Sequence, residues 1–175
     1  MNAVVVYSSK TGFTKKYADW IASQLSVVSY DVSEVNKRFL KKYDTIIFGG
    51  GVYVGKISDA KFLEKNIPKL PHQHWLVFAV GLTPPDDLAN QEKLMAENFS
   101  TEVLKRIDFF YFQGGIMTNK LPRTQKLTVN LLRKMVSFKK EPSEDEKWIL
   151  EALSKDSDYS DMESVNVLLE KLDSV

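Results

Sequence analysis

The first residues of the chain carry the pattern that most constrains its fold, which is a strand, a tight loop and a helix in immediate succession. Residues 3–7, AVVVY, form a continuous apolar run rich in β-branched side chains, as is typical of a strand buried on both faces. A loop with several hydroxyl side chains and one glycine follows at residues 8–14. Residues 15–25 then place apolar side chains at helical spacing, so the loop is expected to join a buried strand to a helix.

This loop has the composition of an anion-binding site. Ser9, Thr11 and Thr14 can each donate an O–H to a phosphate oxygen, and backbone N–H groups at a helix N-terminus point to the same place. Gly12 permits close approach of the backbone and a positive φ angle. The alternative is a turn followed by a helix cap, because Ser and Thr favour both structures. The position of the loop, directly between strand and helix, favours phosphate binding.

Further strands and helices alternate along the rest of the chain. Strands are expected at residues 27–32, 45–48, 75–80 and 109–112, and helical segments at 37–41, 58–70, 87–98, 101–107 and 162–172. This alternation predicts a parallel sheet with helices on both faces. A length of 175 residues and a continuous pattern favour a single domain over residues 1–175.

The spacing S-x-T-G-x-T in the first loop resembles the phosphate loop of the flavodoxins. The whole chain resembles the flavodoxin superfamily, and more closely the menaquinone-dependent protoporphyrinogen oxidase group of flavodoxin-domain proteins. The closer likeness lies in VVVYSSKTGFTKKYADWIA, in IIFGGGVYVGKI and in residues 113–136. The resemblance implies a flavodoxin-like three-layer α/β sandwich. Its five-stranded parallel sheet would have the order 2-1-3-4-5, with helices on both faces and a basic insert after the fifth strand.

Three loops rich in turn residues leave the carboxyl ends of predicted strands, at residues 8–14, 49–56 and 81–87. Sheets of this kind, of which flavodoxin with FMN is a known example, bind ligands beyond these strand ends. The three consecutive glycines at residues 49–51 are costly to order, which favours close approach to a flat ring or a peptide that turns beneath one. The alternative is a glycine loop without a ligand.

The resemblance also implies a non-covalently bound FMN. Phosphate contacts are implied for Ser9, Lys10, Thr11, Gly12, Phe13 and Thr14. Ring contacts are implied for Gly50, Gly51, Val52, Tyr53, Gly81, Leu82 and Thr83. Tyr53 is expected either to stack on the ring or to lie exposed in its loop. The chain departs from the flavodoxin pattern at Phe13, where Asn is common, and at the pair Pro84 and Pro85 in its third loop.

FMN implies redox chemistry at flavin N5, and three functions remain open. The first is an electron-transfer flavoprotein that serves a redox partner protein. The second is an oxidase like the menaquinone-dependent protoporphyrinogen IX dehydrogenases, which passes electrons to a quinone, and the third is a cofactor-free interaction module. The sequence assigns no catalytic residue. The chain has no cysteine, which excludes thiol chemistry and cysteine-bound metals, so redox work requires a borrowed cofactor.

Overall charge and hydropathy narrow the expected partners and location. The net charge of +1 gives no reason to expect a nucleic acid partner. No signal peptide and no apolar run of the roughly 20 residues needed for a membrane span is visible, so the cytoplasm is the expected location. His72 and His74 precede a predicted strand without a cluster of carboxylates, so no metal site is expected.

Charge is unevenly distributed toward the end of the chain. Residues 109–140 contain seven bases and no acid, whereas residues 141–163 contain nine acids and two lysines. Apolar side chains at helical spacing within residues 120–140 suit a basic amphipathic helix, which would allow peripheral contact with an anionic membrane. The alternative is that the acidic segment covers this basic one and its apolar side chains join the core.

Overall fold

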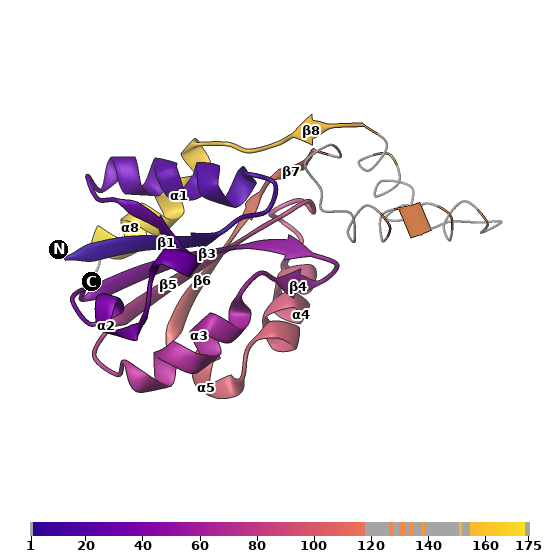
Figure 1. Cartoon of the computed structure of the whole chain (residues 1–175). Helices are drawn as coiled ribbons and strands as arrows, with labels where there is room; N and C mark the ends of the chain where they lie inside the picture. Colours follow the sequence, from indigo (N-terminus) through magenta and orange to yellow (C-terminus); the bar gives the residue numbers. More distant parts are fainter. Residues whose placement is uncertain are drawn as a thin grey trace.

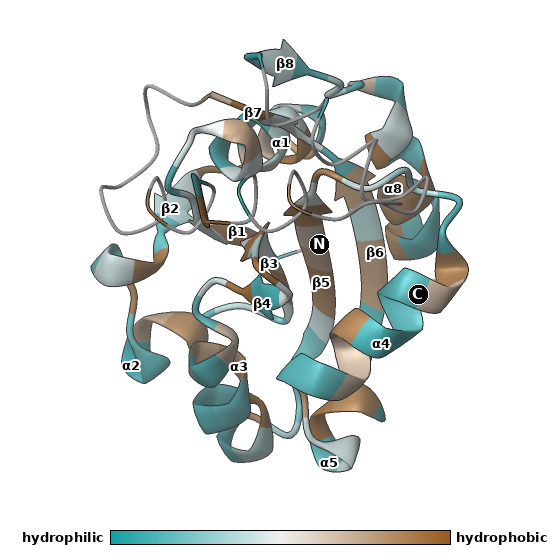
Figure 2. Cartoon of the chain, turned by 90° about the vertical axis from the view of Figure 1, so that its right-hand side faces the viewer, coloured by the Kyte–Doolittle hydropathy of each residue, from teal (hydrophilic) through white to brown (hydrophobic). Residues whose placement is uncertain are grey.

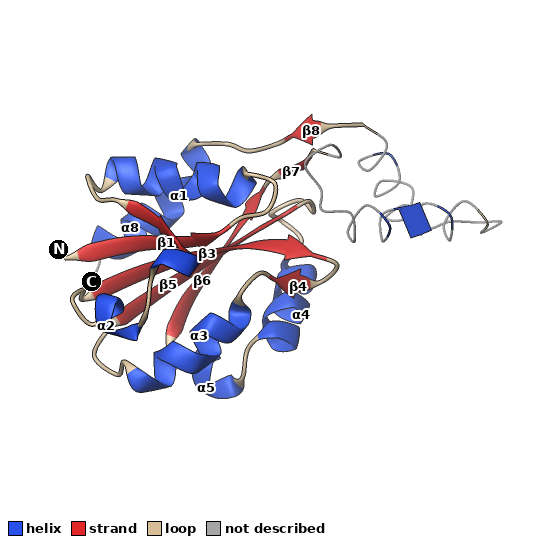
Figure 3. Ribbon diagram, in the orientation of Figure 1, coloured by secondary structure: helices blue, strands red, loops and turns tan. Residues whose placement is uncertain are grey.

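The computed structural model describes residues 2–117 and 155–173, together with residues 127, 130, 131, 134, 138 and 151. In this part of the chain a twisted parallel sheet lies between two layers of helices (Figures 1 and 3). The strand order is β2-β1-β3-β5-β6, with the short strand β4 paired to β3 alone. Counted over the parallel strands, this is the order 2-1-3-4-5, so the predicted flavodoxin-like fold is confirmed.

The bounds of the elements follow the predicted alternation. The parallel strands are β1 (Ala3–Ser8), β2 (Ser29–Asp31), β3 (Thr45–Tyr53), β5 (His74–Gly81) and β6 (Ile107–Gln113). Helix α1 (Phe13–Gln24) and the closing helix α8 (Asn166–Asp173) cover one face. The other face carries α3 (Ala60–Asn66), α4 (Leu88–Asn98) and α5 (Thr101–Leu104). The short helix α2 (Lys37–Leu40) precedes β3.

Two apolar clusters form the core, one on each face of the sheet. Successive side chains of a strand point to opposite faces, so Val5 packs in the α1 cluster while Val4 and Val6 pack in the α3 cluster. The middle of β5, including Trp75 and Phe78, is fully buried. Burial on both faces explains the continuous apolar runs that predicted these strands.

The third strand is longer than predicted, and its three glycines lie inside the strand instead of in a loop. Gly49 and Gly50 pair with Tyr7 and Ser8 of β1. A Cβ added to Gly49 would clash with the ring of Phe78, and one added to Gly50 would lie 2.5 Å from Cγ2 of Ile57. These two glycines therefore make room for the side chains of Phe78 and Ile57, which pack against β3 from other strands. No local sequence pattern reveals such a packing requirement.

A hairpin that the sequence did not predict follows these glycines. The end of β3 turns through Val54 and Gly55 into β4 (Lys56–Ile57), and both turn residues have positive φ angles, 51° and 72°. Positive φ at both turn residues suits two-residue hairpins but is rare for a β-branched residue. The Asn98 side chain holds the turn, because it accepts a hydrogen bond from Ile57 N (2.9 Å) and donates one to Gly55 O (2.9 Å).

Several boundaries differ from the prediction for identifiable reasons. The second strand is shorter because Asp31 already caps the 3₁₀ turn η1 (Val32–Glu34), and α3 begins after Asp59 instead of Ser58. The turns η2 (Ile67–Lys69) and η3 (Glu163–Val165) occupy residues that were predicted as ends of α-helices. The basic segment at residues 120–140 lies largely outside the described residues, as does much of the acidic segment.

After β6 the chain leaves the sheet and later returns beside its point of departure. Strand β7 (Gly115–Ile116) pairs antiparallel with β8 (Ser157–Asp158), with Gly115 opposite Asp158. Both strands lie near the N-terminal end of α1 (Figure 1). Within the described residues no helix is long and apolar enough to cross a membrane.

Candidate functional site

The first loop lies at the carboxyl edge of the sheet, which faces the viewer in Figure 2. β1 ends at Ser8 and α1 begins at Phe13, so residues 9–12 make the whole connection. Gly12 precedes the helix with a φ of 101°, which confirms the expected positive angle. Its N–H donates to Oγ of Ser9 (3.1 Å), and its carbonyl accepts the first helical bond from Lys16 N (2.9 Å).

The N-terminus of α1 is open. Among the described residues no side chain caps it, and its first turn carries no acid. The amides of this turn therefore keep their hydrogen-bonding capacity, and the positive end of the helix dipole faces the loop. No atom of the described residues lies within 4 Å of a Cβ built on Gly12, so this part of the chain leaves room above the loop. These are the features of an anion site at a helix N-terminus.

The loop hydroxyls lie close to the end of β3. Thr11 is 8% exposed and Thr14 is 2% exposed, so both are held in fixed positions. Oγ1 of Thr11 lies 3.4 Å from the hydroxyl of Tyr53. Oγ1 of Thr14 lies 3.0 Å from the point where a Cβ of Gly51 would be. The fold thus brings the predicted residues of the first and second loops together, with Tyr53 lying against the first loop.

Three lysines surround this loop, but two of them are neutralised. Lys15 pairs with Asp19 (2.6 Å), whose side-chain hydrogen bond raises the pKa of Lys15, and Lys16 pairs with Asp158 (2.9 Å). Lys10 places its Nζ 4.9 Å from the centre of the Tyr53 ring, and within the described residues it has no carboxylate partner. Lys10 therefore brings to the loop a positive charge that no carboxylate of the described residues compensates.

The third loop is organised by contacts that the sequence did not predict. Oγ1 of Thr83 lies 2.6 Å from the hydroxyl of Tyr111 and accepts a hydrogen bond from the Asn90 amide (2.9 Å). Gln113 donates to the carbonyl of Leu82 (3.1 Å). Burial raises the pKa of Tyr111 against the opposing hydrogen bonds from Thr83. In the sequence, this role of Tyr111 is indicated only by the presence of one hydroxyl side chain within the aromatic run at residues 109–112.

Phe13 turns its ring into the protein, while its backbone begins α1. The ring is 6% exposed, and its Cζ would lie 2.7 Å from a Cβ on Gly115. Gly114 lies under the same side chain, with 3.3 Å between the point for its Cβ and Cβ of Phe13. An apolar side chain at this position therefore packs between α1 and β7, and the backbone remains available to the loop.

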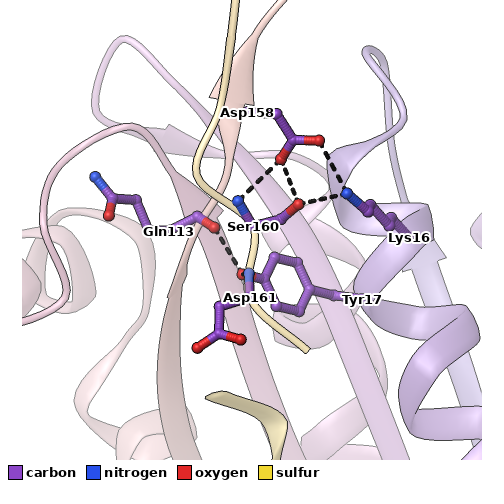
Figure 4. Close-up of polar contacts among 6 residues, drawn as sticks. All are labelled: Lys16, Tyr17, Gln113, Asp158, Ser160 and Asp161. Atoms are coloured by element: carbon purple, nitrogen blue, oxygen red, sulfur yellow. Dashed lines mark hydrogen bonds and ion pairs between the residues drawn. The ribbon is translucent and has the colours of Figure 1, made fainter. Parts of the chain in front are cut away.

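A group of polar contacts fastens the returning chain to α1 and β6; we call it the clasp (Figure 4). It comprises Lys16, Tyr17, Gln113, Asp158, Ser160 and Asp161. The Tyr17 hydroxyl donates to the carbonyl of Gln113 (2.7 Å) and accepts from Asp161 N (3.0 Å), and Lys16 Nζ donates to Oγ of Ser160 (2.7 Å).

The clasp shifts the titration of two of its members. Burial raises the pKa of Tyr17. Burial alone would also raise the pKa of Asp158, but hydrogen bonds from Ser160 and Lys16 outweigh it and hold that pKa below its usual value. Lys16 and Asp158 are 142 residues apart in the chain, so no local pattern in the sequence indicates this contact.

The two histidines lie away from this edge. His74 is the first residue of β5, and its Nε2 lies 2.8 Å from the carboxylate of Asp108. His72 is exposed. Within the described part of the chain no three His, Asp or Glu residues gather in a metal-binding group. Neither histidine contributes to the loops at the carboxyl edge.

The chain belongs to the flavodoxin domain family, whose model matches residues 4–143. A stretch of 68 residues is 37% identical to an uncharacterized protein of Methanocaldococcus jannaschii, covering 37% of this chain and 45% of that protein. The alignment thus spans less than half of that relative's length.

Solved structures with a similar arrangement include several flavodoxins. Flavodoxin 2 from Bacillus cereus is 20% identical, over 65% of this chain and 84% of that one, with a TM-score of 0.48. A flavodoxin from the domain Archaea is 18% identical over 77% and 98%, with a TM-score of 0.46. A Fusobacterium nucleatum flavodoxin mutant bound to flavin mononucleotide is 15% identical over 69% and 79%, with a TM-score of 0.41.

Proposed function

We propose that this chain binds FMN non-covalently at the carboxyl edge of its sheet and acts in electron transfer or oxidoreduction at flavin N5. The observation that carries the proposal is the N-terminus of α1, which no side chain of the described residues caps and which adjoins a loop of hydroxyls and the positive charge of Lys10. Membership of the flavodoxin domain family supports it. The Fusobacterium nucleatum relative described as bound to flavin mononucleotide adds a precedent for the ligand.

The residues present fit a phosphate monoester. Ser9, Thr11 and Thr14 can donate hydroxyl hydrogen bonds, and the first amides of α1 can donate backbone ones. Gly12 leaves the space that an oxygen of the phosphate would need. The chain's own part is to anchor and orient the cofactor and to exclude water from one side of it. FMN, when bound, supplies one- or two-electron chemistry through its ring.

The ring would lie between the second and third loops. β1, β3 and β5 are neighbours in the sheet, so the segments after their carboxyl ends adjoin one another. Val52 and Tyr53 end β3 on one side, and on the other side Gly81 ends β5 and residues 82–83 follow it. Because the Thr83 hydroxyl is already engaged by Tyr111 and Asn90, we propose that the third loop contacts the ring through its backbone.

Titration of the purified chain with FMN and with riboflavin tests the proposal. Flavin fluorescence is followed as protein is added, and the cofactor is identified in any coloured preparation. We expect FMN to bind at least about tenfold more tightly than riboflavin, because only FMN carries the phosphate. Absence of binding would favour the cofactor-free interaction module. Equal binding of the two flavins would show that the first loop does not hold the phosphate of FMN.

A second candidate is an oxidase of a porphyrinogen-like substrate that passes electrons to a quinone. It is favoured by the course of the chain, which leaves the sheet at β7 and returns at β8 beside Phe13 and the N-terminus of α1. An insert at this place is one of the three stretches in which the sequence resembles the menaquinone-dependent protoporphyrinogen oxidase group.

Two measurements separate this oxidase from a carrier. The FMN-loaded protein is mixed with protoporphyrinogen IX and a menaquinone analogue without oxygen, and porphyrin fluorescence is followed. Porphyrin formation that requires both the protein and the quinone supports the oxidase. Co-sedimentation with anionic vesicles at two salt concentrations then tests membrane contact through residues 120–140, because electrostatic binding of a basic segment weakens with salt.

A further inference from the structure

A tyrosine from the hairpin after β3 lies directly on the phosphate loop. The hydroxyl of Tyr53 is 3.4 Å from Oγ1 of Thr11, and Nζ of Lys10 lies 4.9 Å from the centre of its ring. The hydroxyl is also 3.1 Å from the point where a Cβ of Gly51 would be, and Oγ1 of Thr14 is 3.0 Å from the same point. Three hydroxyls from two separate chain segments therefore converge beside the N-terminus of α1.

We propose that Tyr53 supplies a further hydroxyl to the phosphate site and so helps the protein to select a phosphorylated flavin over free riboflavin. This inference rests on the proposed function. It gives Tyr53 a different task from the ring stacking that its aromatic character suggests, because here the hydroxyl and not the ring face carries the interaction.

The distance to Thr11 leaves the hydroxyl free to change partner. At 3.4 Å the contact between Tyr53 and Thr11 is at the long limit of an O–H···O hydrogen bond, so little is lost when it breaks. A hydrogen bond to a charged phosphate oxygen is shorter and roughly twice as strong as one between neutral groups. An anion at the loop would therefore draw hydrogen bonds from both hydroxyls.

Lys10 gives the same tyrosine a second role. The ring of Tyr53 supports the Lys10 ammonium by a cation–π contact, whereas Lys15 and Lys16 are held by carboxylates. The positive charge of Lys10 therefore remains available next to the loop. Tyr53 positions this charge and adds a donor beside it, and both effects favour a dianionic phosphate over a neutral ribityl chain.

The backbone of the hairpin sets where Tyr53 can reach. Tyr53 pairs with Lys56 across the turn, and Asn98 of α4 holds the turn on its other side. Gly51 clears the path, because a Cβ there would lie 2.9 Å from Cε2 of the tyrosine ring. Gly51 lies two positions before Tyr53, and the tight turn begins one position after it, at Val54. Together they allow the tyrosine ring to lie over the first loop.

The test replaces Tyr53 by Phe, which removes the hydroxyl and keeps the ring. Dissociation constants for FMN and riboflavin are measured with wild type and Y53F. We expect Y53F to weaken FMN at least about fivefold and to change riboflavin by less than about twofold. The matched control is Y43F, which removes a hydroxyl from a tyrosine packed on Phe39 and should leave both constants unchanged.

Two further variants examine the charge. Lys10→Met should weaken FMN and flatten the dependence of its binding on salt, because the cation is removed while the apolar stem is kept. Lys15→Met is the matched control, since Lys15 is already paired with Asp19 and should change FMN binding by less than about twofold.

Each outcome decides between the alternatives. Equal losses for FMN and riboflavin in Y53F would show a role in ring stacking, and no loss for either would remove Tyr53 from the site; both overturn the inference. If wild type binds neither flavin, inorganic phosphate is titrated and followed by phosphorus NMR. Phosphate binding that weakens in Y53F would then uphold the inference while the proposed function fails, and no phosphate binding to wild type would overturn both.

Discussion

The loops that follow β1 and β5 lie at the same edge of the sheet, on either side of β3, and each contains a glycine and a threonine, yet they differ in what their polar groups do. In the first loop no side chain of the described residues caps the helix amides, and the contact of Thr11 with Tyr53 is long, at 3.4 Å. In the third loop the Thr83 hydroxyl is bound on two sides, by Tyr111 and by Asn90. Hydroxyls with unused capacity can serve a ligand, whereas hydroxyls already satisfied serve the fold.

The glycines of the two loops show the same contrast. Gly12 needs its positive φ of 101°, but a Cβ there would meet no atom of the described chain within 4 Å. A Cβ on Gly81 would clash with the Tyr111 hydroxyl. Gly12 is required because of its backbone φ angle, whereas Gly81 is required because a side chain there would clash with Tyr111. Residue type alone therefore does not separate a binding loop from a structural one.

The largest effect is expected where the first loop loses donors. Thr11→Ala with Thr14→Ala removes two hydroxyls, each worth about 1.5–3 kcal/mol when it binds a charged group. FMN affinity should therefore fall about a hundredfold or more, measured by fluorescence titration. Circular dichroism should show an unchanged fold. An unchanged FMN affinity would contradict the view that the hydroxyls of the first loop serve a ligand.

Overpacking the third loop should act on stability. Gly81→Ala forces its new methyl group against Tyr111, and inserting a methyl into a filled site costs about 1–3 kcal/mol. Urea unfolding measures the loss. Gly55→Ala provides a comparison at an exposed turn, where the nearest atom to the new Cβ would be 3.6 Å away and the strain would come from the φ angle of 72° alone.

Removing the shared hydroxyl of the third loop should have a smaller effect of the same kind. Thr83→Val leaves Tyr111 and Asn90 without a partner, which we expect to cost about 1–2 kcal/mol in unfolding free energy. FMN affinity should change by less than about threefold if this loop contacts the ring through its backbone. Thr83→Ser keeps the hydroxyl and should recover most of the stability. A large loss of FMN affinity in Thr83→Val alone would erase the distinction between the loops.

The smallest effect is expected at the clasp, which joins the helix of the first loop to the strand beside the third. Asp158 has a lowered pKa, so its contribution is present above its unfolded pKa of about 3.8 and is lost as the pH falls through the lower folded value. Because its side chain is 41% exposed, Asp158→Asn should cost less than about 1 kcal/mol at pH 7.

Urea unfolding at pH 7 and at several values below pH 4 checks this expectation. The difference between wild type and Asp158→Asn should shrink as the pH falls, since protonated Asp158 resembles the amide. A difference that stays constant across this range would assign the effect to packing instead of charge.

The parts of the molecule that the sequence predicted are those that depend on neighbouring residues. The alternation of strands and helices predicted the parallel sheet and its layers, and the resemblance to the flavodoxins supplied the strand order. The glycine at position 12 allowed for the positive φ that this residue adopts. Which of the predicted residues contact FMN stays a prediction. The sequence did not reveal the strand glycines, since only the ring of Phe78 on another strand explains Gly49. The bond between Thr83 and Tyr111 and the contact of Lys16 with Asp158 likewise join residues far apart in the chain.

The pairing of β7 with β8 has a consequence for how this protein can be altered. Ile116 lies opposite Ser157, so the two ends of the intervening chain are only about one strand spacing apart, and a short turn would suffice to join them. Loop closure costs grow slowly with length, so pieces of very different size can be carried between these fixed ends. The pair of β7 and β8 is therefore a suitable point for exchange, where one intervening sequence can be removed and another inserted while the first loop keeps its contacts with the rest of the fold.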